Sequence, residues 1–116
     1  IAKAMIKVEA IIRQERFSDV KNALATAGFP GLTTYEVKGR GRQMGYTLIF
    51  RGKEQQIDLL PKMKIELVIK EEDLDKVIEL IRQKAFTGNI GDGKIFTYRI
   101  DEVIRVRTGE KGENAL

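Results

Sequence analysis

The chain contains no cysteine, no histidine and no tryptophan among its 116 residues. Without cysteine it can form no disulfide. Without cysteine and histidine, the usual zinc-ligand sets and the nucleophiles that depend on a Cys/His or Ser/His pair are also excluded. The lack of cysteine fits a reducing compartment, so we expect a cytoplasmic protein. No apolar run approaches the roughly 18 residues that a membrane-spanning helix needs, and no signal-peptide pattern opens the chain. The sequence therefore predicts a soluble protein with few routes to catalysis.

Proline is also scarce, with 2 residues, whereas 42% of the residues are hydrophobic and 33% are charged. A chain of this length and composition is expected to form one domain with a modest core, which association between chains could extend. The formal net charge is +4 and the pI is about 9.4. This excess of positive charge favours anionic partners but falls short of a nucleic-acid-binding tail.

An internal repeat organises the rest of the sequence. Residues 7–12 and residues 64–69 are strand-like runs with apolar residues at every second position, and each is followed by an apolar stripe at helical spacing. The first stripe consists of Phe17, Val20, Leu24 and Ala27, and the second of Leu74, Val77, Ile78 and Ile81. We expect the first helix to begin at Ser18 or a nearby acid and to end at Gly28, and the second helix to end at Gly88.

Each unit continues into a further strand, predicted at residues 32–38 and 94–100, which are rich in β-branched and aromatic residues. The order β-α-β-β-α-β predicts a ferredoxin-like α+β fold with one antiparallel sheet and two helices on one face. The opposite sheet face is too polar for a second internal core and must meet water or another subunit; it carries Lys7, Glu9, Ile11, Lys64, Glu66 and Val68. A strand-like stretch at residues 103–107 must also pair, as an edge extension or an intersubunit strand.

A glycine-rich loop at residues 87–94 joins the second helix to the last strand. Gly88, Gly91 and Gly93 let the backbone adopt positive φ and bring N–H groups close to an oxyanion, and Lys94 adds a cation. The spacing matches the start of a Walker A motif, but Ile95 stands where Ser or Thr is needed and a strand follows instead of a helix. A phosphate-binding loop and a simple helix stop with a tight turn both remain open.

The connection between the two units, residues 39–61, is far longer than a hairpin between adjacent strands requires. It opens with a basic, glycine-rich segment at residues 39–45, whose spacing excludes a dinucleotide-binding fingerprint. Its apolar middle, residues 48–50, is costly to leave in water. A solvated hairpin extension and a surface that contacts a partner are the two interpretations.

Three separated segments, residues 36–43, 87–96 and 104–110, resemble the signatures of the PII nitrogen-signalling proteins. They stand in the family's order on the predicted fold, and the match extends from Met5 to the C-terminus as one domain, residues 5–116. Residues 1–4 precede the family's usual start and are expected to be a non-native or disordered extension.

The resemblance implies a compact homotrimer whose three intersubunit clefts bind ATP or ADP, with 2-oxoglutarate joining ATP and Mg²⁺. The connection at residues 39–61 would be the T-loop, which contacts nitrogen-metabolism effectors such as an ammonium transporter or a soluble enzyme. The protein would therefore meet a membrane only indirectly, through a transporter, and would bind no nucleic acid. It would be a signal-transduction protein that senses energy and carbon/nitrogen status, not an enzyme.

Carried over by position, the resemblance assigns ATP or ADP contacts to Ile11, Thr33, Gly39, Arg42, Gln43, Glu66, Val68, Gly91, Asp92, Gly93, Lys94, Arg105 and Arg107, and 2-oxoglutarate contacts to Gln43, Met44, Gly45, Lys62 and Gly91. Residues 91–94 would hold the phosphates with help from Arg42, and Arg105 and Arg107 would reach them from the neighbouring chain. Gln43 would ligate Mg²⁺ and Lys62 would pair with a carboxylate of 2-oxoglutarate. The chemistry agrees, because backbone N–H groups, lysine and arginine suit a polyphosphate.

The sequence departs from the family at two T-loop positions. Gln55 stands where many relatives carry a modifiable tyrosine, so we expect no modification there. Met44 replaces a frequent lysine, which removes a charge next to Gln43 and affects the choice of partner.

Two other classes of protein are weighed against this interpretation. A ferredoxin-like nucleic-acid-binding module would need aromatic residues on its central strands, and residues 7–12 and 64–69 contain none. A small phosphate-ester hydrolase would need a general base, and only Asp92 and Glu66 are candidates. Any ATP hydrolysis is expected to be slow and incidental.

Overall fold

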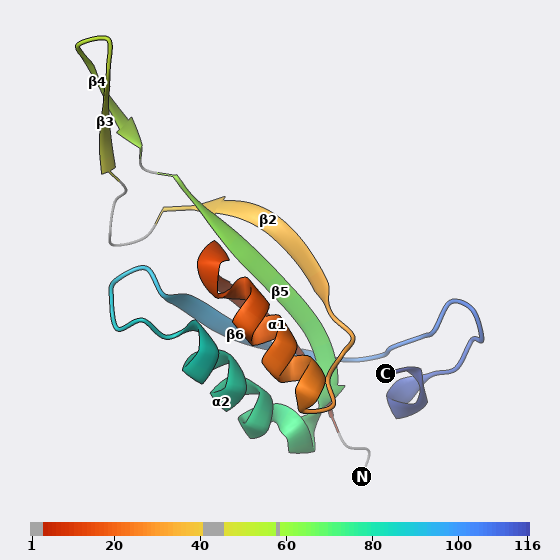
Figure 1. Ribbon diagram of the computed structural model, residues 1–116. Coiled ribbons are helices and arrows are strands. Elements are labelled where there is room, and N and C mark those ends of the chain that lie inside the picture. Colours follow the sequence, from red (N-terminus) through yellow and green to blue (C-terminus); the bar gives the residue numbers. More distant parts are fainter. Residues whose placement is uncertain (1–3, 41–45, 58) are drawn as a thin grey trace.

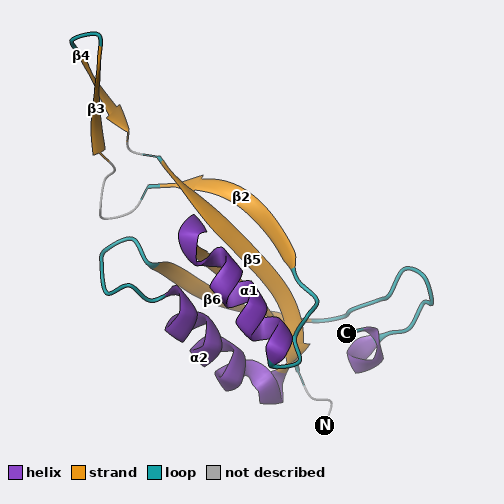
Figure 2. Ribbon diagram, in the orientation of Figure 1, coloured by secondary structure: helices purple, strands orange, loops and turns teal. Residues whose placement is uncertain are grey.

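The computed structural model describes residues 4–40, 46–57 and 59–116, with the backbone alone for residues 46, 48, 50, 56 and 57. The elements are β1 (Met5–Arg13), α1 (Phe17–Thr26), β2 (Thr33–Gly39), β3 (Tyr46–Phe50), β4 (Lys53–Ile57), β5 (Leu60–Lys70), α2 (Leu74–Ala85) and β6 (Gly93–Ile100). Strands β2, β5, β1 and β6 form an antiparallel sheet in that order, and α1 and α2 cover one face of it (Figures 1 and 2). The predicted ferredoxin-like fold is confirmed.

The core lies between the two helices and the alternate residues of β1 and β5. Fully or almost fully buried side chains are Ile6, Val8, Ala10 and Ile12 of β1, Ile65, Leu67 and Ile69 of β5, Val20 and Leu24 of α1, and Val77, Ile81 and Ala85 of α2. The period of two along each strand therefore directs one set of apolar side chains towards the helices, as the repeat predicts. No helix of the described chain is both long and apolar enough to cross a membrane.

Both helices are entered through a 3₁₀ turn, which changes where they begin. Gln14–Arg16 precedes α1 and Glu71–Asp73 precedes α2, so the internal repeat extends to these turns. The expectation that Ser18 or an acid starts the first helix is wrong: α1 begins at Phe17, and its N-cap residue, Arg16, makes no side-chain capping hydrogen bond. The reason is that the turn continues directly into the helix, leaving no separate capping position.

The ends of the helices agree with the prediction in one case and not in the other. Gly28 follows α1 with φ of +99° and donates its N–H to the carbonyl of Ala25, as a C-terminal glycine does. The second helix ends at Ala85, earlier than the predicted Gly88, because Phe86 is already extended. Gly88 belongs to the following loop, where a carboxylate and not a helix carbonyl accepts its N–H.

The sheet face opposite the helices carries a connected group of charges, as predicted. Lys7 lies 3.3 Å from Glu66, and Lys64 lies 3.4 Å from Glu66 and 3.7 Å from Glu9. The Lys64 ammonium also lies over the ring of Tyr35, and the Lys7 ammonium over the ring of Tyr98. These charges satisfy one another across the strands, so the face is no second internal core.

The segment after β6 corrects one of the two predictions for residues 103–107, the edge extension of the sheet, while the intersubunit strand stays a prediction. The strand expected at residues 103–107 does not form within the chain: Ile104 makes a single bridge to Lys111, and the N–H of Arg105 donates to the carbonyl of Glu110 at 2.9 Å. Gly109 and Gly112, with φ of +72° and +67°, turn the chain back before a strand can extend. The alternating pattern of apolar and charged residues is therefore part of a short reversed loop.

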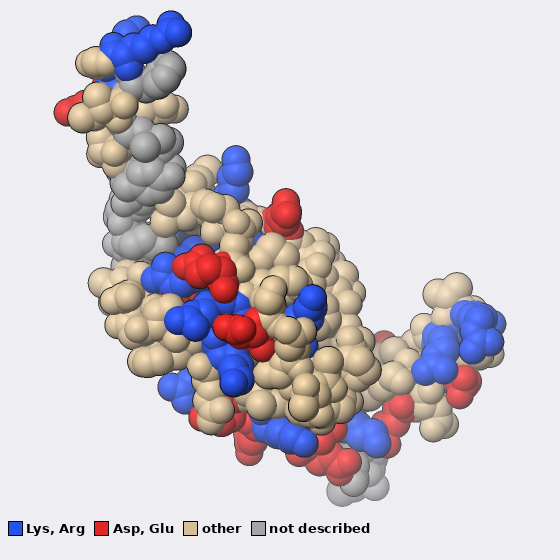
Figure 3. Space-filling view, in the orientation of Figure 1, with Lys and Arg blue, Asp and Glu red and all other residues tan. Residues whose placement is uncertain are grey.

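The connection at residues 39–61 contains a separate two-stranded hairpin, β3 paired with β4, that projects away from the main sheet (Figure 1). Its turn uses Arg51 and Gly52, both with positive φ, and exposed Lys and Arg side chains lie at its outer end (Figure 3). Ile49 is 74% exposed, so within the described chain nothing covers this part of the predicted apolar middle. The structure therefore shows the hairpin that the first of the two interpretations, a solvated hairpin extension, predicted.

Most of the predicted N-terminal extension, residues 1–3, lies outside the described residues. Ala4 is within them: its carbonyl accepts a hydrogen bond from the N–H of Glu71 at 3.0 Å, and it packs against the core.

Candidate functional site

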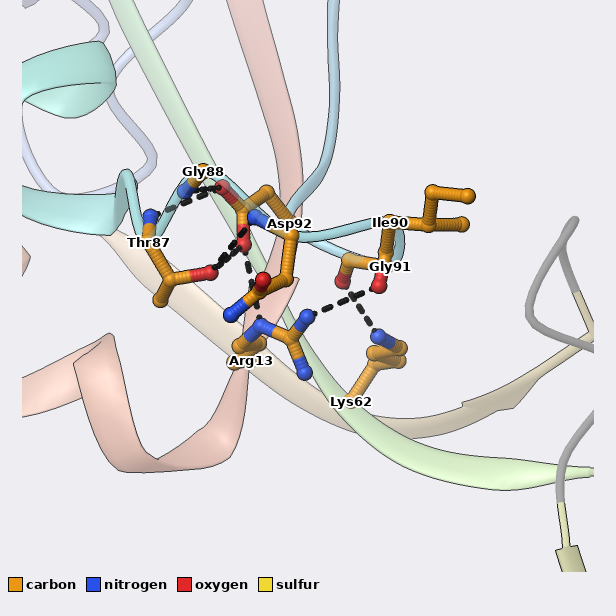
Figure 4. Close-up of polar contacts among 8 residues, drawn as sticks. Arg13, Lys62, Thr87, Gly88, Ile90, Gly91 and Asp92 are labelled. Atoms are coloured by element: carbon orange, nitrogen blue, oxygen red, sulfur yellow. Dashed lines mark hydrogen bonds and ion pairs between the residues drawn. The ribbon is translucent and has the colours of Figure 1, made fainter.

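The glycine-rich loop lies against the ends of two central strands. Arg13 is the last residue of β1 and Lys62 is its partner in the β1–β5 ladder, so their side chains leave the sheet next to each other. Arg13 donates from Nη2 to the carbonyl of Ile90 at 2.9 Å, and Lys62 donates from Nζ to the carbonyl of Gly91 at 2.6 Å (Figure 4). Two cations of the sheet therefore hold the tip of the loop.

Asp92 is turned into its own loop. One carboxylate oxygen accepts the backbone N–H groups of Thr87 at 2.7 Å and Gly88 at 2.9 Å, and the other accepts the Arg13 Nε–H at 3.0 Å and the Thr87 hydroxyl (Figure 4). Burial opposes ionisation of this carboxyl, but the hydrogen bonds from Thr87, Arg13 and Gly88 outweigh burial and hold the pKa of Asp92 well below its usual range. The carboxylate is ionised and its lone pairs are already used within the protein.

Lys62 is a buried cation, with only 7% of its surface exposed. Burial, followed by the neighbouring Arg13 guanidinium, lowers the pKa of Lys62 from its ordinary value, while Glu15 and Asp92 partly offset this. Among the ion pairs of the described chain, none includes Lys62. A buried ammonium that donates to a backbone carbonyl is well placed to donate also to a carboxylate or phosphate oxygen.

The last glycine of the loop is required by close packing. Gly93 has φ of +108°, and a Cβ atom there would stand 1.8 Å from the carbonyl oxygen of Ile11. Gly88 and Gly91 also have positive φ, +88° and +106°, as the sequence predicts for such a loop. The close approach places Lys94 opposite Ile11 in the β1–β6 ladder.

The residues predicted from the resemblance fall into two groups at different ends of the sheet. The first group surrounds the loop and consists of Ile11, Gly39, Lys62, Gly91, Asp92, Gly93 and Lys94; Gly39 lies beside the Lys62 side chain. The second group surrounds a cavity of about 400 Å³ that is lined by Thr33, Glu66 and Val68 together with Leu116 of the C-terminal segment. Thr33 and Glu66 are partners in the β2–β5 ladder.

Arg105 belongs with the second group. Its guanidinium donates to the backbone oxygen of Leu116 at 3.2 Å and to the Glu110 carboxylate at 3.4 Å. The loop precedes β6 and the C-terminal segment follows it, so an extended strand from Gly93 to Ile100, about 23 Å long, separates them (Figure 1). One chain alone does not bring Arg105 to the glycine-rich loop. Arg107 is exposed in the reversed loop beyond it.

Four predicted residues, Arg42, Gln43, Met44 and Gly45, lie outside the described residues. Gln55, the position of the absent tyrosine, is exposed on β4. In the described ranges no group of three or more acidic residues is arranged to hold a metal ion.

Sequence reasoning missed Arg13 and Thr87, which make the contacts that shape the loop. Thr87 opens the loop and could have been recognised as a local partner for Asp92, because Thr and Asp side chains frequently bond to nearby backbone groups in turns. Arg13 carries no local signal. Its importance follows from the register of β1 and β5, which the sequence alone does not give.

Comparisons with known proteins show the family and support the fold. The model of the family described as "Nitrogen regulatory protein P-II" matches residues 5–110. The chain is 55% identical over 112 residues to nitrogen regulatory protein P-II 2 of Methanothermobacter thermautotrophicus, covering 97% of each chain. It is 53% identical over 112 residues to nitrogen regulatory protein P-II of Rhodospirillum rubrum, covering 97% of this chain and all of the relative. A crystal structure of Arabidopsis thaliana PII bound to citrate superposes with a TM-score of 0.80 at 40% identity, over 98% of this chain and 94% of that one.

Proposed function

Because the chain belongs to the nitrogen regulatory protein P-II family, we propose that it is a non-enzymatic signalling protein that senses ATP or ADP together with 2-oxoglutarate. In this proposal it regulates nitrogen-metabolism partners through the T-loop, residues 39–61. The observation that carries the proposal is the loop at residues 87–94, where positive-φ glycines lie beside the cations Arg13, Lys62 and Lys94. Such a combination of backbone and fixed positive charge suits a polyphosphate.

The nucleotide would bind between two chains. Lys94 and the loop lie at one end of the sheet, whereas Arg105 and the cavity lined by Thr33, Glu66 and Val68 lie at the other. A ring of three chains would place the loop end of each chain against the Arg105 end of the next and would complete three equivalent sites. In each site Arg105 and Arg107 would reach the phosphates, and Thr33, Glu66 and Val68 would contact the nucleoside with Ile11 and Gly39.

A dicarboxylate such as 2-oxoglutarate would bind at Lys62. The buried ammonium would exchange the Gly91 carbonyl for a carboxylate, a stronger charge-assisted partner. Mg²⁺, held by the Gln43 amide oxygen and by oxygens of the ligands, would supply positive charge between the two anions. Gln43 lies outside the described residues, and the described residues contain no group of three or more acidic side chains arranged to hold a metal ion.

Binding would be read out by the T-loop. Gln43 belongs to this connection, and its recruitment to the ligands would reposition Met44 and Gly45 at its base. Thermodynamic linkage makes this coupling reciprocal. If a partner prefers the T-loop conformation in which Gln43 does not contact the ligands, partner binding would lower the affinity for 2-oxoglutarate by the same factor by which 2-oxoglutarate lowers the affinity for the partner. The partner class is an ammonium transporter or a soluble enzyme of nitrogen metabolism.

The two rival functions receive less support. Tyr35 and Tyr98 are partly exposed on the polar sheet face, but each ring lies under a lysine ammonium, Lys64 or Lys7, and so is not a free platform for bases. For a hydrolase, the Asp92 carboxylate already accepts hydrogen bonds from three donors of its own loop and from Arg13, which leaves it poorly suited as a general base.

Calorimetry with ATP and Mg²⁺ tests the proposal. We expect binding by the wild-type protein and a loss of about 1.5–3 kcal/mol in Arg105→Ala or Arg107→Ala, the range for charge-assisted hydrogen bonds. Arg99→Ala is the matched control, because Arg99 is an exposed arginine of β6 whose guanidinium pairs with Glu71 at 3.1 Å. Unchanged ATP affinity in both single variants, or steady multiple-turnover hydrolysis of saturating Mg-ATP, would contradict it.

A further inference from the structure

Three consecutive residues at the tip of the glycine-rich loop are each tied to a cation at the end of the central sheet. Arg13 holds Ile90 and Asp92, and Lys62 holds Gly91. Arg13 and Lys62 are the last cross-strand pair of the β1–β5 ladder, so both anchors stand on rigid strands. The loop thus has a fixed position with respect to the sheet, although glycine-rich segments are otherwise among the most adaptable parts of a chain.

Asp92 and Thr87 close the same loop internally. Asp92 accepts two backbone N–H groups and the hydroxyl of Thr87, and that hydroxyl in turn accepts the N–H of Asn89 at 3.2 Å. The donors at the start of the loop are therefore satisfied by a carboxylate of the protein itself. A ligand would meet the remaining part of the loop, next to Gly91, Gly93 and Lys94.

We propose that Arg13, Thr87 and Asp92 are positioning residues that preset the loop for an anion, and that Asp92 does not contact the ligand. This deepens the proposed function and rests on it. The family resemblance assigns Asp92 to the phosphates, but its four donors point it the other way, into the loop and towards Arg13 (Figure 4). A loop held in one conformation before binding loses less conformational freedom when the anion arrives.

The tethering also explains how two adjacent cations are tolerated. Arg13 and Lys62 repel each other, and this repulsion adds to burial, the larger cause, in lowering the pKa of Lys62. The Asp92 carboxylate and two loop carbonyls face these cations and compensate for the repulsion. Arg13 and Lys62 therefore fix the conformation of the loop, and the loop oxygens stabilise the two cations at this short separation.

The test compares Thr87→Val with Thr87→Ser in the full-length protein. Valine has nearly the shape of threonine but lacks the hydroxyl that bonds Asp92 and Asn89, whereas serine retains it. We expect Thr87→Val and Asp92→Asn to weaken ATP binding by about 10- to 100-fold, the range found when residues that orient metal ligands are lost. Thr87→Ser should keep the affinity within a few-fold of wild type. Amide hydrogen exchange at residues 87–93 should accelerate in the two weakened variants, while exchange in β1 and β5 stays unchanged.

A double-mutant cycle separates positioning from direct contact. Arg13 supports the loop through Asp92 and also through the Ile90 carbonyl, so Arg13→Gln should cost less affinity in the Asp92→Asn background than in the wild-type protein, but not nothing. Wild-type ATP affinity in both Thr87→Val and Asp92→Asn would overturn the inference. So would weakened binding with unchanged loop exchange, because Asp92 would then act on the ligand directly. If the wild-type protein binds no ATP, the proposed function fails instead, and the exchange measurement still decides whether these residues hold the loop.

Discussion

At the scale of single residues, Gly93 shows most directly how the site depends on backbone geometry. Two separate features require glycine where the loop joins β6: the φ of +108°, and the 1.8 Å distance that a Cβ atom would have to the Ile11 carbonyl oxygen. Gly28 offers a matched comparison, because it has φ of +99° and no atom within 4 Å of a Cβ position. Comparing Gly28 with Gly93 therefore separates the cost of a positive φ from the cost of a steric clash.

We expect Gly28→Ala to lower the free energy of unfolding by about 1–2 kcal/mol, the cost of a left-handed conformation for an L-residue. Gly93→Ala should cost more than about 4 kcal/mol, because β1 and β6 must also separate at their shared end. Urea denaturation measures both values. Equal losses in the two variants would show that the contact with Ile11 relaxes easily, contrary to this account.

Asp92 adds a dependence on pH at the same scale. Its pKa in the folded protein lies below the ordinary value, so folding favours the ionised carboxylate. The stability that it contributes is therefore fully present above about pH 4, the ordinary range for an aspartate, and is lost as the pH falls further. We expect Asp92→Asn to be less stable than wild type at pH 6 and this difference to shrink towards pH 3 in urea denaturation. A difference that is constant between these pH values would argue against the hydrogen-bonded carboxylate.

At the scale of elements, the sequence predicts the regular parts of the molecule well. The period of two in β1 and β5 identifies the core face because side chains alternate strictly along a strand. The same reasoning does not give a strand within the chain at residues 103–107, where a similar alternation lies in a reversed loop closed by Gly109 and Gly112. A strand needs a partner as well as a pattern, and the pattern alone does not show whether one is present.

The candidate site is only partly readable in the same way. The glycines of the loop and Lys94 are local features that the sequence displays. The partnership of Arg13 with Lys62 and with Asp92 depends on strand register and on the path of the loop, which bring together residues far apart in the chain. Composition and spacing do not contain this information.

The β3–β4 hairpin is an element that the core does not need. The β2–β5 ladder closes at Gly39 and Leu60, and β3 pairs with β4 in a sheet of its own. We therefore expect replacement of residues 46–57 by a short Gly/Ser linker to leave the urea midpoint nearly unchanged and to preserve binding of ATP and 2-oxoglutarate, while partner binding is lost. Gln43→Ala is the converse variant, since it should lose 2-oxoglutarate binding measured with Mg-ATP present but weaken ATP binding only modestly. Loss of cooperative unfolding after hairpin replacement would show that the core depends on it.

At the scale of the whole molecule, the two groups of site residues make the single chain incomplete. Lys94 lies with the glycine-rich loop before β6, and Arg105 lies with the C-terminal segment after it, at the far end of an extended strand. A site that uses both residues is possible only where two chains meet. Light scattering should accordingly give a mass of about 40 kDa for a chain of 13.2 kDa, as expected for a closed ring of three chains.

Mixing two inactive variants tests this arrangement directly. Lys94→Ala removes the loop cation and Arg105→Ala removes the arginine, so each variant alone should bind ATP weakly at every site. If the two are unfolded together and refolded as mixed trimers, a site regains both residues where an intact loop from one chain meets an intact arginine from the next. Random assembly of equal amounts restores about one site in four, and calorimetry should detect that fraction with wild-type affinity. A site built within a single chain would gain nothing from mixing, because every chain would still lack one of the two cations. If mixed trimers are verified and calorimetry finds no tight ATP site in them, the shared site is refuted.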